Sequence, residues 1–526
     1  MTSAEQAYDA FLYPSMPRAT TQPDRLAALG RVFGLPTVPA SRCRVLELGC
    51  SDGGNLLATA LANPGAEVVG LDVSGAQLER GRAAAKELGA SNLRLEQLDL
   101  REAPSLGTFD YVIAHGLYCW IPSALQPALL HSVSACLRPH GVAYLGLSVL
   151  PGAYTLLAMR GLLRRRAQAE KEPRQQVARA RAFMEALAEL APAGTAAMFA
   201  AGRDKVRAGG DEWVRHELLA EENNPVWFHE LAASAKAHGL SYLADAELPA
   251  GLASNLLAPG PLERYQALAR DAVEREQLLD DLVARAFRRA LFVPAAAKVD
   301  RKLHPDRLVG LSVTATHAVP AGGWGAPDEG GFEVFRAEGP GCAEAPPGQL
   351  RTRHPLARAA LRLVAEAFPS ALPVEGLAAA ARARAEAAGW PLPAPDARDE
   401  AIVREHALLG VTRGLLDPWL EAPACAKADE LPRASPLARW RAARGAHVVN
   451  AHHAHVPVDP FARALLPLLD GTRDRAALAR TLAAQKELAV TDGDRPLVDP
   501  AERERALAEP VSVSLGRLAQ AALLVE

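Results

Sequence analysis

Over the first 150 residues, short continuous apolar runs alternate with segments in which apolar residues recur at helical spacing. Five short apolar runs have the length and composition of buried parallel strands, at residues 45–48, 67–73, 93–100, 109–116 and 142–149. Segments between them have the spacing of helices that bury one face, at residues 55–61, 77–88 and 124–137. Strands that alternate with helices predict a parallel, doubly wound α/β sheet.

The pattern changes after the fifth strand. Residues 155–215 are rich in Arg and Ala, with Leu and Met at helical spacing, which predicts a helical insertion. Two further apolar runs, at 239–247 and 287–293, predict an antiparallel hairpin that completes a seven-stranded sheet. Residues 319–350 are rich in Gly and Pro and predict a linker with short strands around 332–335. The pattern from 354 to 420 is helical again.

Composition and charge limit the classes of binding partner and the cellular compartment that we expect for this chain. The chain has 526 residues and a net charge of −3, which argues against nucleic acid or an anionic membrane as a partner. Its six cysteines contain no C-x-x-C pair, so we expect reduced thiols in a cytoplasmic protein. The sequence shows neither a signal peptide nor an apolar run of the roughly 18 residues that a membrane helix needs.

A glycine-rich turn follows the first predicted strand. Residues 49–54 read Gly-Cys-Ser-Asp-Gly-Gly, which does not fit the dinucleotide form G-x-G-x-x-G. An acid, Glu47, instead stands two positions before Gly49. This E-x-G-x-x-x-G form resembles motif I of class I S-adenosylmethionine (SAM) methyltransferases. The alternative is a tight strand-to-helix turn that binds nothing.

Polar residues also end the next three strands. Asp72, Asp99 and His115 fall at the carboxyl ends of their strands, where open α/β sheets bind ligands. We expect Asp72 to accept the ribose hydroxyls and Asp99 to meet the adenine amino group. The alternative for either acid is a helix cap or a turn. The turn at 137–141, Leu-Arg-Pro-His-Gly, resembles the L-K-P-G-G turn of class I methyltransferases.

Nearly the whole chain resembles bacterial methyltransferases that carry a methyltransferase regulatory domain, in particular the rickettsial-type protein-lysine methyltransferases. The resemblance rests on Tyr8-Asp9, Tyr13-Pro-Ser15, His216-Glu217 and the segments 45–56, 113–122, 223–231, 239–246, 276–291, 301–303, 435–439 and 469–473. It implies SAM as cofactor, a protein or peptide acceptor and a homodimer. Residues 147–154, Leu-Ser-Val-Leu-Pro-Gly-Ala-Tyr, depart from the family pattern Y-N-T-Y-P-G-W-H and lack its polar and aromatic side chains.

This resemblance gives each region an expected role. The fold class is a seven-stranded class I methyltransferase sheet with a helical insertion, followed by mostly helical and winged-helix-like domains. The expected regions are a SAM-binding core at 1–154, an insertion with a candidate role in dimerisation at 155–215, a regulatory region at 216–318, a middle helical domain at 319–432 and a winged-helix-like domain at 433–526. For the N-terminal segment we weigh a lid over the cofactor against a packing helix, and favour packing for Leu26, Leu29 and Phe33.

The candidate cofactor contacts surround the glycine turn and the strand ends. They are Tyr13, Glu47, Gly49, Cys50, Ser51, Asp52, Gly53, Asn55, Asp72, Val73, Gln77, Asp99, Leu100, His115 and Gly116. The candidate catalytic residues follow the fourth strand, where acceptor groups lie in this fold. His115 is a candidate proton acceptor. Tyr118 and Trp120 are candidates to cradle a cation, with a core position as the alternative for Trp120.

Three function classes stay open: methylation of a protein lysine, methylation of a small molecule, and a SAM-binding scaffold without turnover. A histidine group at 447, 452, 453 and 455 adds one further candidate. On a strand, His453 and His455 would share a face, but Asp459 is the one nearby acid. We therefore expect a surface or interface strand rather than a metal site.

Overall fold

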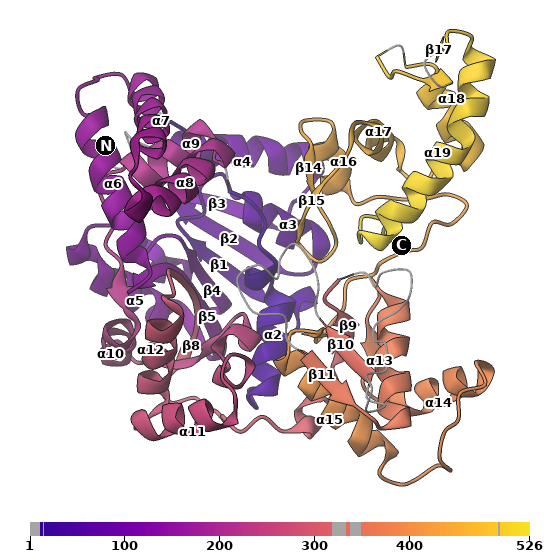
Figure 1. Ribbon diagram of the computed structural model, residues 1–526, viewed down its shortest axis with the longest axis horizontal. Coiled ribbons are helices and arrows are strands. Elements are labelled where there is room, and N and C mark those ends of the chain that lie inside the picture. Colours follow the sequence, from indigo (N-terminus) through magenta and orange to yellow (C-terminus); the bar gives the residue numbers. More distant parts are fainter. Residues whose placement is uncertain (1–10, 14, 318–332, 337–348, 486, 493–494) are drawn as a thin grey trace.

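The computed structural model describes residues 11–526 except 14, 318–332, 337–348, 486 and 493–494. Tyr8 and Asp9 lie outside the described residues. A central sheet with the strand order β3-β2-β1-β4-β5-β8-β7 organises the first 300 residues, and the short β6 pairs with β5 (Figure 1). The strands are β1 (Arg44–Leu48), β2 (Glu67–Asp72), β3 (Leu93–Gln97), β4 (Phe109–His115), β5 (Leu137–Leu150), β6 (Val226–Trp227), β7 (Leu240–Asp245) and β8 (Phe287–Pro294).

The first five strands are parallel, and β8 runs antiparallel to both β5 and β7. This order confirms the seven-stranded methyltransferase sheet and its terminal hairpin. The third strand is shorter than predicted: it ends at Gln97, and Leu100 begins the 3-10 helix η3 (Leu100–Leu106).

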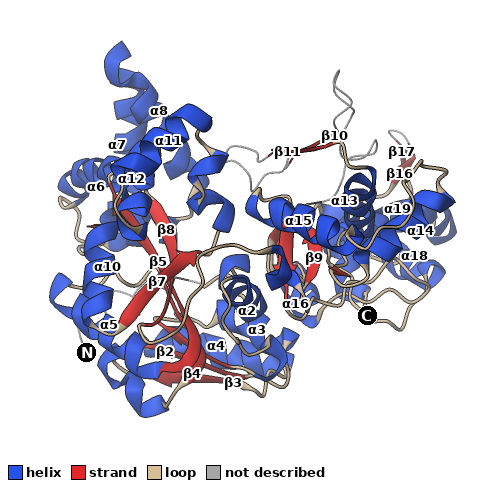
Figure 2. Ribbon diagram, turned by 90° about the horizontal axis from the view of Figure 1, so that it is seen from below, coloured by secondary structure: helices blue, strands red, loops and turns tan. Residues whose placement is uncertain are grey.

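Strand residues alternate between two hydrophobic cores, one on each face of the sheet. On β1 and β4, Val45 and Tyr111 face one core, while Leu46 and Val112 face the other. The first face is covered by α2 (Pro23–Val32), α3 (Gly54–Ala62) and α4 (Gly75–Leu88). The second is covered by η3, α5 (Gln126–Cys136) and α10 (Phe228–Ala237). Figure 2 shows these helices on opposite sides of the strands. Burial on both faces explains why the strands read as continuous apolar runs.

The segment between β5 and β6 is helical and packs around a separate small core. Its elements are α6 (Ala153–Ala167), α7 (Pro173–Leu190), α8 (Ala193–Ala208), α9 (Asp211–Trp213) and the π-helix η5 (Val214–Leu219). Between β7 and β8 lie η6 (Leu248–Gly251), η7 (Ala253–Asn255), α11 (Pro259–Leu268) and α12 (Ala272–Val283).

A buried ionic cluster joins α12 to β8. The Arg288 side chain is fully buried, and its guanidinium lies 2.6 Å from Asp280 and 2.8 Å from Glu276. Arg288 also pairs in register with Leu147 on β5. The cluster therefore braces the sheet next to the strand end that faces the predicted acceptor site.

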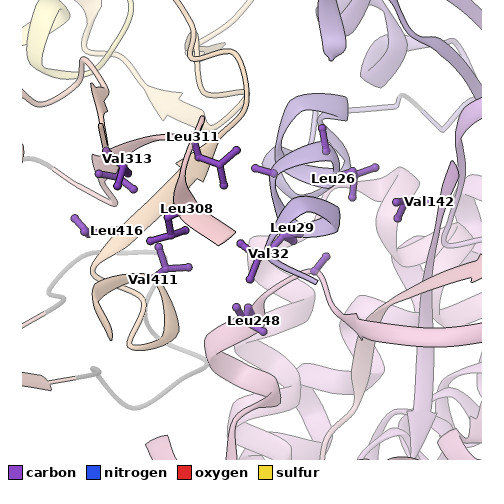
Figure 3. Close-up of a cluster of buried hydrophobic side chains, with 14 of the residues drawn as sticks. Leu26, Leu29, Val32, Val142, Leu248, Leu308, Leu311, Val313, Val411 and Leu416 are labelled. Carbon is purple, nitrogen blue, oxygen red and sulfur yellow. The ribbon is translucent and has the colours of Figure 1, made fainter. Parts of the chain in front are cut away.

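Helix α2 packs between the sheet and the middle domain. Leu26 and Leu29 share a core with Leu311 and Val313, among others (Figure 3). The Arg25 guanidinium forms two hydrogen bonds with the Asp417 carboxylate, at 2.6 and 3.1 Å. Leu26, Leu29 and Phe33 are at most 5% exposed, so the packing role that we favoured for them is confirmed.

The middle domain combines a three-stranded sheet with helices. Its sheet has the order β12-β9-β13, with β9 (Ser312–Ala315), β12 (Leu372–Pro373) and β13 (Leu416–Trp419). Its helices are η8 (Pro305–Leu308), α13 (Pro355–Ala367), α14 (Leu377–Ala387) and α15 (Asp399–Thr412). A separate strand pair joins β10 (Glu333–Arg336) and β11 (Gln349–Thr352).

The C-terminal domain has its own hydrophobic core. Its elements are α16 (Pro436–Ala442), β14 (His447–Val449), β15 (His455–Pro457), α17 (Pro460–Leu465), η9 (Leu466–Leu468), α18 (Arg475–Ala483), β16 (Thr491–Asp492), β17 (Arg495–Pro496) and α19 (Pro500–Gln520). None of the helices in the described part of the chain has the length and apolar character needed to cross a membrane.

The histidine prediction needs a correction. The single strand expected over 447–456 is a hairpin, and His453 lies in its turn with a φ of 58°. His453 and His455 therefore do not share a strand face. His455 bonds the Pro17 carbonyl, and His452 bonds the Pro369 carbonyl. Among the residues described here, no three His, Cys, Asp or Glu side chains are grouped to hold a metal ion.

Candidate cofactor and acceptor site

The glycine turn joins β1 to α3 at the carboxyl edge of the sheet. The amide groups of Gly49 and Cys50 both donate to the Leu71 carbonyl, at 2.9 and 3.0 Å, which ties the turn to the end of β2. Ser51 has a φ of 56°, in the left-handed region that L side chains rarely adopt. Its amide donates to Asp72 Oδ2 at 2.8 Å, which holds this unusual conformation in place.

Asp72 is the acid that ends β2 beside the glycine turn. Its Oδ2 receives the Ser51 amide, and its Oδ1 receives the Ser74 amide at 2.9 Å. A carboxylate accepts hydrogen bonds only and offers about four lone-pair sites. The contact with the ribose diol stays a prediction for this residue, and its position at the end of β2 suits that role.

Glu47 and Asn55 form the floor of the turn. Asn55 Nδ2 donates to Glu47 Oε1 at 3.1 Å, whereas the buried Glu47 Oε2 has no hydrogen-bond partner in the described structure. Burial raises the pKa of Glu47 to about 8. An acceptor without a partner beside the glycine turn fits the positively charged amino group of SAM, which would supply the missing hydrogen bond.

The N-terminal segment crosses the turn. Ser51 Oγ donates to the Tyr13 carbonyl, and Gln77 Oε1 accepts from both the Tyr13 amide, at 3.0 Å, and Ser51 Oγ, at 2.8 Å. Asp52 Oδ1 accepts the Ser15 amide at 2.9 Å. Tyr13 and Ser15 therefore lie against the predicted cofactor loop, where the lid alternative would place them.

Gly54 shows how close this crossing is. A Cβ added at Gly54 would lie 2.2 Å from the Ser15 carbonyl oxygen, a distance at which the backbone must move. Glycine is therefore needed here because another backbone segment passes over it.

The remaining residues predicted to bind the cofactor differ in whether their polar groups already have partners within the protein. The Asp99 carboxylate caps η3 and pairs with Arg101 at 2.8 Å, and these hydrogen bonds lower its pKa. Its contact with adenine stays a prediction, and Arg101 would have to share the carboxylate. Leu100 is buried, Val73 is half-buried, and Gly116 donates to the Gly146 carbonyl at 2.8 Å.

His115 is held by Tyr144. Its Nδ1 lies 3.0 Å from the Tyr144 hydroxyl, and its ring stacks with that residue. Burial lowers the pKa of His115 well below its ordinary value, which disfavours the protonated imidazolium. Its roles as proton acceptor and as cofactor contact stay predictions.

The two aromatic candidates have other partners. Tyr118 is 3% exposed and packs in the core on the α5 side of the sheet, so its role beside the acceptor stays a prediction. Trp120 is half-buried, and the Arg160 guanidinium lies 5.1 Å from its ring centroid. A cation from the acceptor would have to share that ring with Arg160.

The sequence analysis did not assign two side chains near this segment, Glu217 and Arg18, to the site. Glu217 on η5 accepts a hydrogen bond from the Tyr13 hydroxyl at 3.4 Å. The charge of Arg18 acts on the pKa values of Glu47, His115 and Glu217. No spacing rule connects residue 217 with a loop at residue 50, because only the folded insertion brings them together.

The C-terminal domain reaches the same segment. Arg441 Nη1 lies 3.3 Å from Met16 Sδ, and His455 Nε2 lies 2.8 Å from the Pro17 carbonyl oxygen. Arg444 pairs with Glu87 on α4 at 2.7 Å. The segment over the cofactor loop is therefore held between the sheet domain and the C-terminal domain.

Three family models match separate parts of the chain. A methyltransferase domain matches residues 45–141, a predicted methyltransferase regulatory domain matches 210–294, and the PKMT C-terminal winged helix domain matches 430–523. These matches cover the sheet with its glycine turn, the region that completes the sheet, and the C-terminal domain.

Similar proteins come from Rickettsia. One uncharacterised protein of Rickettsia prowazekii is 29% identical over 57% of this chain and 54% of its own length. The chain therefore spans about half the length of that relative. A second uncharacterised protein of the same organism is 26% identical over 44% of this chain and 94% of its own length. The structure of PKMT2 from Rickettsia typhi in complex with AdoHcy superposes with a TM-score of 0.82, covering 98% of this chain and 100% of that one at 24% identity. That likeness establishes the fold over nearly the full length.

Proposed function

We propose that this chain, which belongs to the class I SAM-dependent methyltransferases and carries a methyltransferase regulatory domain and a PKMT-type winged helix, transfers a methyl group to a lysine side chain of a protein. SAM supplies the methyl group, which the neutral amine takes by in-line displacement, so that an N–C bond forms as the S–C bond breaks. The protein's part is to hold the cofactor and to align and deprotonate the amine.

The cofactor side of the proposal rests on the edge formed by β1 and β2. The Asp72 carboxylate ends β2 beside the turn, Glu47 has a buried oxygen without a partner in the described structure, and the backbone amides of Tyr13 and Ser15 are bonded to the residues of the turn and of α4. Together these groups suit a ligand with a ribose diol and a charged amino-acid tail.

The acceptor side rests on a single observation, the docking of the PKMT-type domain at the cofactor loop. Through Arg441 and His455 this domain contacts the same backbone segment that covers the turn. A domain placed there adds surface beside the opening, which a protein acceptor needs and a small metabolite does not. We further propose that the chain acts as a homodimer in the cytoplasm.

A small-molecule acceptor is the second candidate, and it is favoured by the end of β5. Leu147, Val149 and Leu150 are buried apolar residues, so this strand end presents few groups for binding a polar peptide. Tyr154, just beyond the strand, is 53% exposed and contacts Trp227 edge-on.

Two measurements separate these functions. Calorimetry with SAM tests the cofactor, and absence of binding would refute the assignment of the glycine turn. Incubation of a cell lysate with the protein and isotope-labelled SAM, followed by mass spectrometry, tests the acceptor. Label on protein lysines is expected. Label confined to small metabolites would favour the second candidate, and binding without any label would indicate a scaffold.

A further inference from the structure

The Glu217 carboxylate lies at the opening beside the cofactor loop. It accepts the Tyr13 hydroxyl at 3.4 Å, and the Tyr13 backbone is bonded to Ser51 and Gln77 of the predicted cofactor site. Tyr13 therefore connects Glu217 by hydrogen bonds to the groups that we expect to hold SAM.

The chain on both sides of Glu217 is fastened near the ends of β4 and β5. Its own carbonyl accepts from Arg160, and the Asn224 amide, beyond the end of η5, donates to the Cys119 carbonyl at 2.8 Å. Cys119 follows β4, and its Sγ donates to the Ser148 carbonyl on β5 at 3.3 Å. The negative charge of Glu217 also adds to the increase that burial causes in the pKa of the Cys119 thiol. The residues around Glu217 therefore connect the segment over the cofactor loop with the region that follows β4 and β5.

The carboxylate has no ionic partner of its own in the described structure. Arg160 bonds the backbone carbonyl of Glu217 rather than its side chain, and its guanidinium stacks on Trp120. The charges of Arg160 and, more weakly, Arg18 act on the Glu217 carboxylate without a direct ion pair to it in the described structure. The side chain is half-buried, so it keeps an open edge. A partly desolvated carboxylate with an open edge favours a cationic ligand.

We propose that Glu217 is the anionic group that receives the positively charged amine of the acceptor, an inference that rests on the proposed amine methylation. A carboxylate in this position selects an ammonium group over a neutral group of the same shape, because a neutral ligand would leave the charge without a partner. The same carboxylate can take the proton that the nitrogen must lose before it attacks. Burial already raises the pKa of Glu217, which brings it closer to that of an amine.

The test compares two probes that share a butyl chain, one with a charged head group and one with a neutral head group. n-Butylammonium copies the end of a lysine side chain, and n-butanol is its neutral counterpart. Their affinities for the full-length protein are measured by saturation-transfer NMR in the presence of S-adenosylhomocysteine. We expect the wild-type protein to bind n-butylammonium about ten-fold more tightly, since charge-assisted hydrogen bonds are about twice as strong as neutral ones. In Glu217→Gln we expect the two probes to bind with about equal affinity, so that the preference is lost.

Glu221→Gln is the matched control. Glu221 lies two residues beyond the end of η5, the helix that carries Glu217. Its side chain is exposed, so this variant should keep the wild-type preference. Glu217→Ala serves in place of Glu217→Gln if that variant fails to fold. A preference that persists in the Glu217 variants, or that is absent in the wild type, would overturn the inference. If label reaches protein lysines while the Glu217 variants keep the preference, only this inference fails. A preference that depends on Glu217, without label on any lysine, would overturn the proposed lysine acceptor instead.

Discussion

Replacing Asp72 with alanine should abolish measurable SAM binding. Asp72 ends β2, and each of its oxygens already accepts one backbone amide, from Ser51 at 2.8 Å and from Ser74 at 2.9 Å. We assign the ribose hydroxyls to this carboxylate, whose oxygens together offer about four acceptor lone pairs. The substitution therefore removes both ribose contacts and frees the glycine turn from β2.

The size of the effect follows from these contacts. A hydrogen bond to a charged group contributes about 1.5–3 kcal/mol, so two ribose contacts amount to about 3–6 kcal/mol. Because about 1.4 kcal/mol corresponds to a factor of ten, the Kd should rise about 100- to 10,000-fold. Loss of the Ser51 contact adds to this change, because the left-handed conformation of that residue is no longer held in place.

Isothermal titration calorimetry with SAM measures the change, and thermal unfolding verifies that the variant folds. Glu67→Gln is the control on the same strand. Glu67 begins β2, roughly 16 Å from Asp72 at the rise of an extended chain, and it pairs with Arg44 on the surface. Its affinity should match that of the wild type. A folded Asp72→Ala protein that binds SAM within three-fold of the wild type would refute the ribose assignment.

Three further predictions concern the cofactor loop and the sheet. Gly54→Ala should weaken SAM binding at least ten-fold, because its Cβ would displace the Ser15 carbonyl 2.2 Å away, whereas Gly161→Ala, in open space on α6, should leave calorimetric binding unchanged. Arg288→Met should lower the free energy of unfolding by about 3–5 kcal/mol in urea titrations, because it removes the buried cation that Glu276 and Asp280 share and leaves Asp280 with Arg285 alone; a loss below about 1 kcal/mol would contradict the bracing role. Burial raises the pKa of Glu47 from 4.5 to about 8, so the folded state holds an extra proton between these values, and the stability contributed by Glu47 falls as pH rises from 4.5 to 8. Without SAM, Glu47→Gln should therefore lose less thermal stability than the wild type over this range, and identical pH profiles would contradict the raised pKa.

The sheet was predictable because its signal is local. Strands buried on both faces must be apolar throughout, and the first five pair in parallel with helices between them. The acids that end these strands therefore converge on one edge whatever the rest of the chain does. For this reason Glu47, Asp72 and the glycine turn could be placed from the sequence.

The choice between binding and structural roles was not predictable in the same way. Asp99 has a position suited to adenine, but Arg101, two residues later, uses its carboxylate. Tyr118 follows β4 in sequence yet turns into the core. In both cases the outcome depends on side-chain packing, which strand position alone does not determine. Glu217 was missed because a helical insertion, rather than a strand end, carries it to the opening.

The contacts of Arg441 and His455 with residues 16 and 17 connect two equilibria. Met16 and Pro17 directly follow the residues bonded to the glycine turn, so the docking of the C-terminal domain and the placement of this segment are linked. If SAM moves the segment when it binds, thermodynamic reciprocity requires that a ligand which alters the docking of this domain changes the affinity for SAM, and that SAM changes the affinity for that ligand by the same factor. We therefore expect occupancy of the cofactor loop to be coupled to binding at the C-terminal domain.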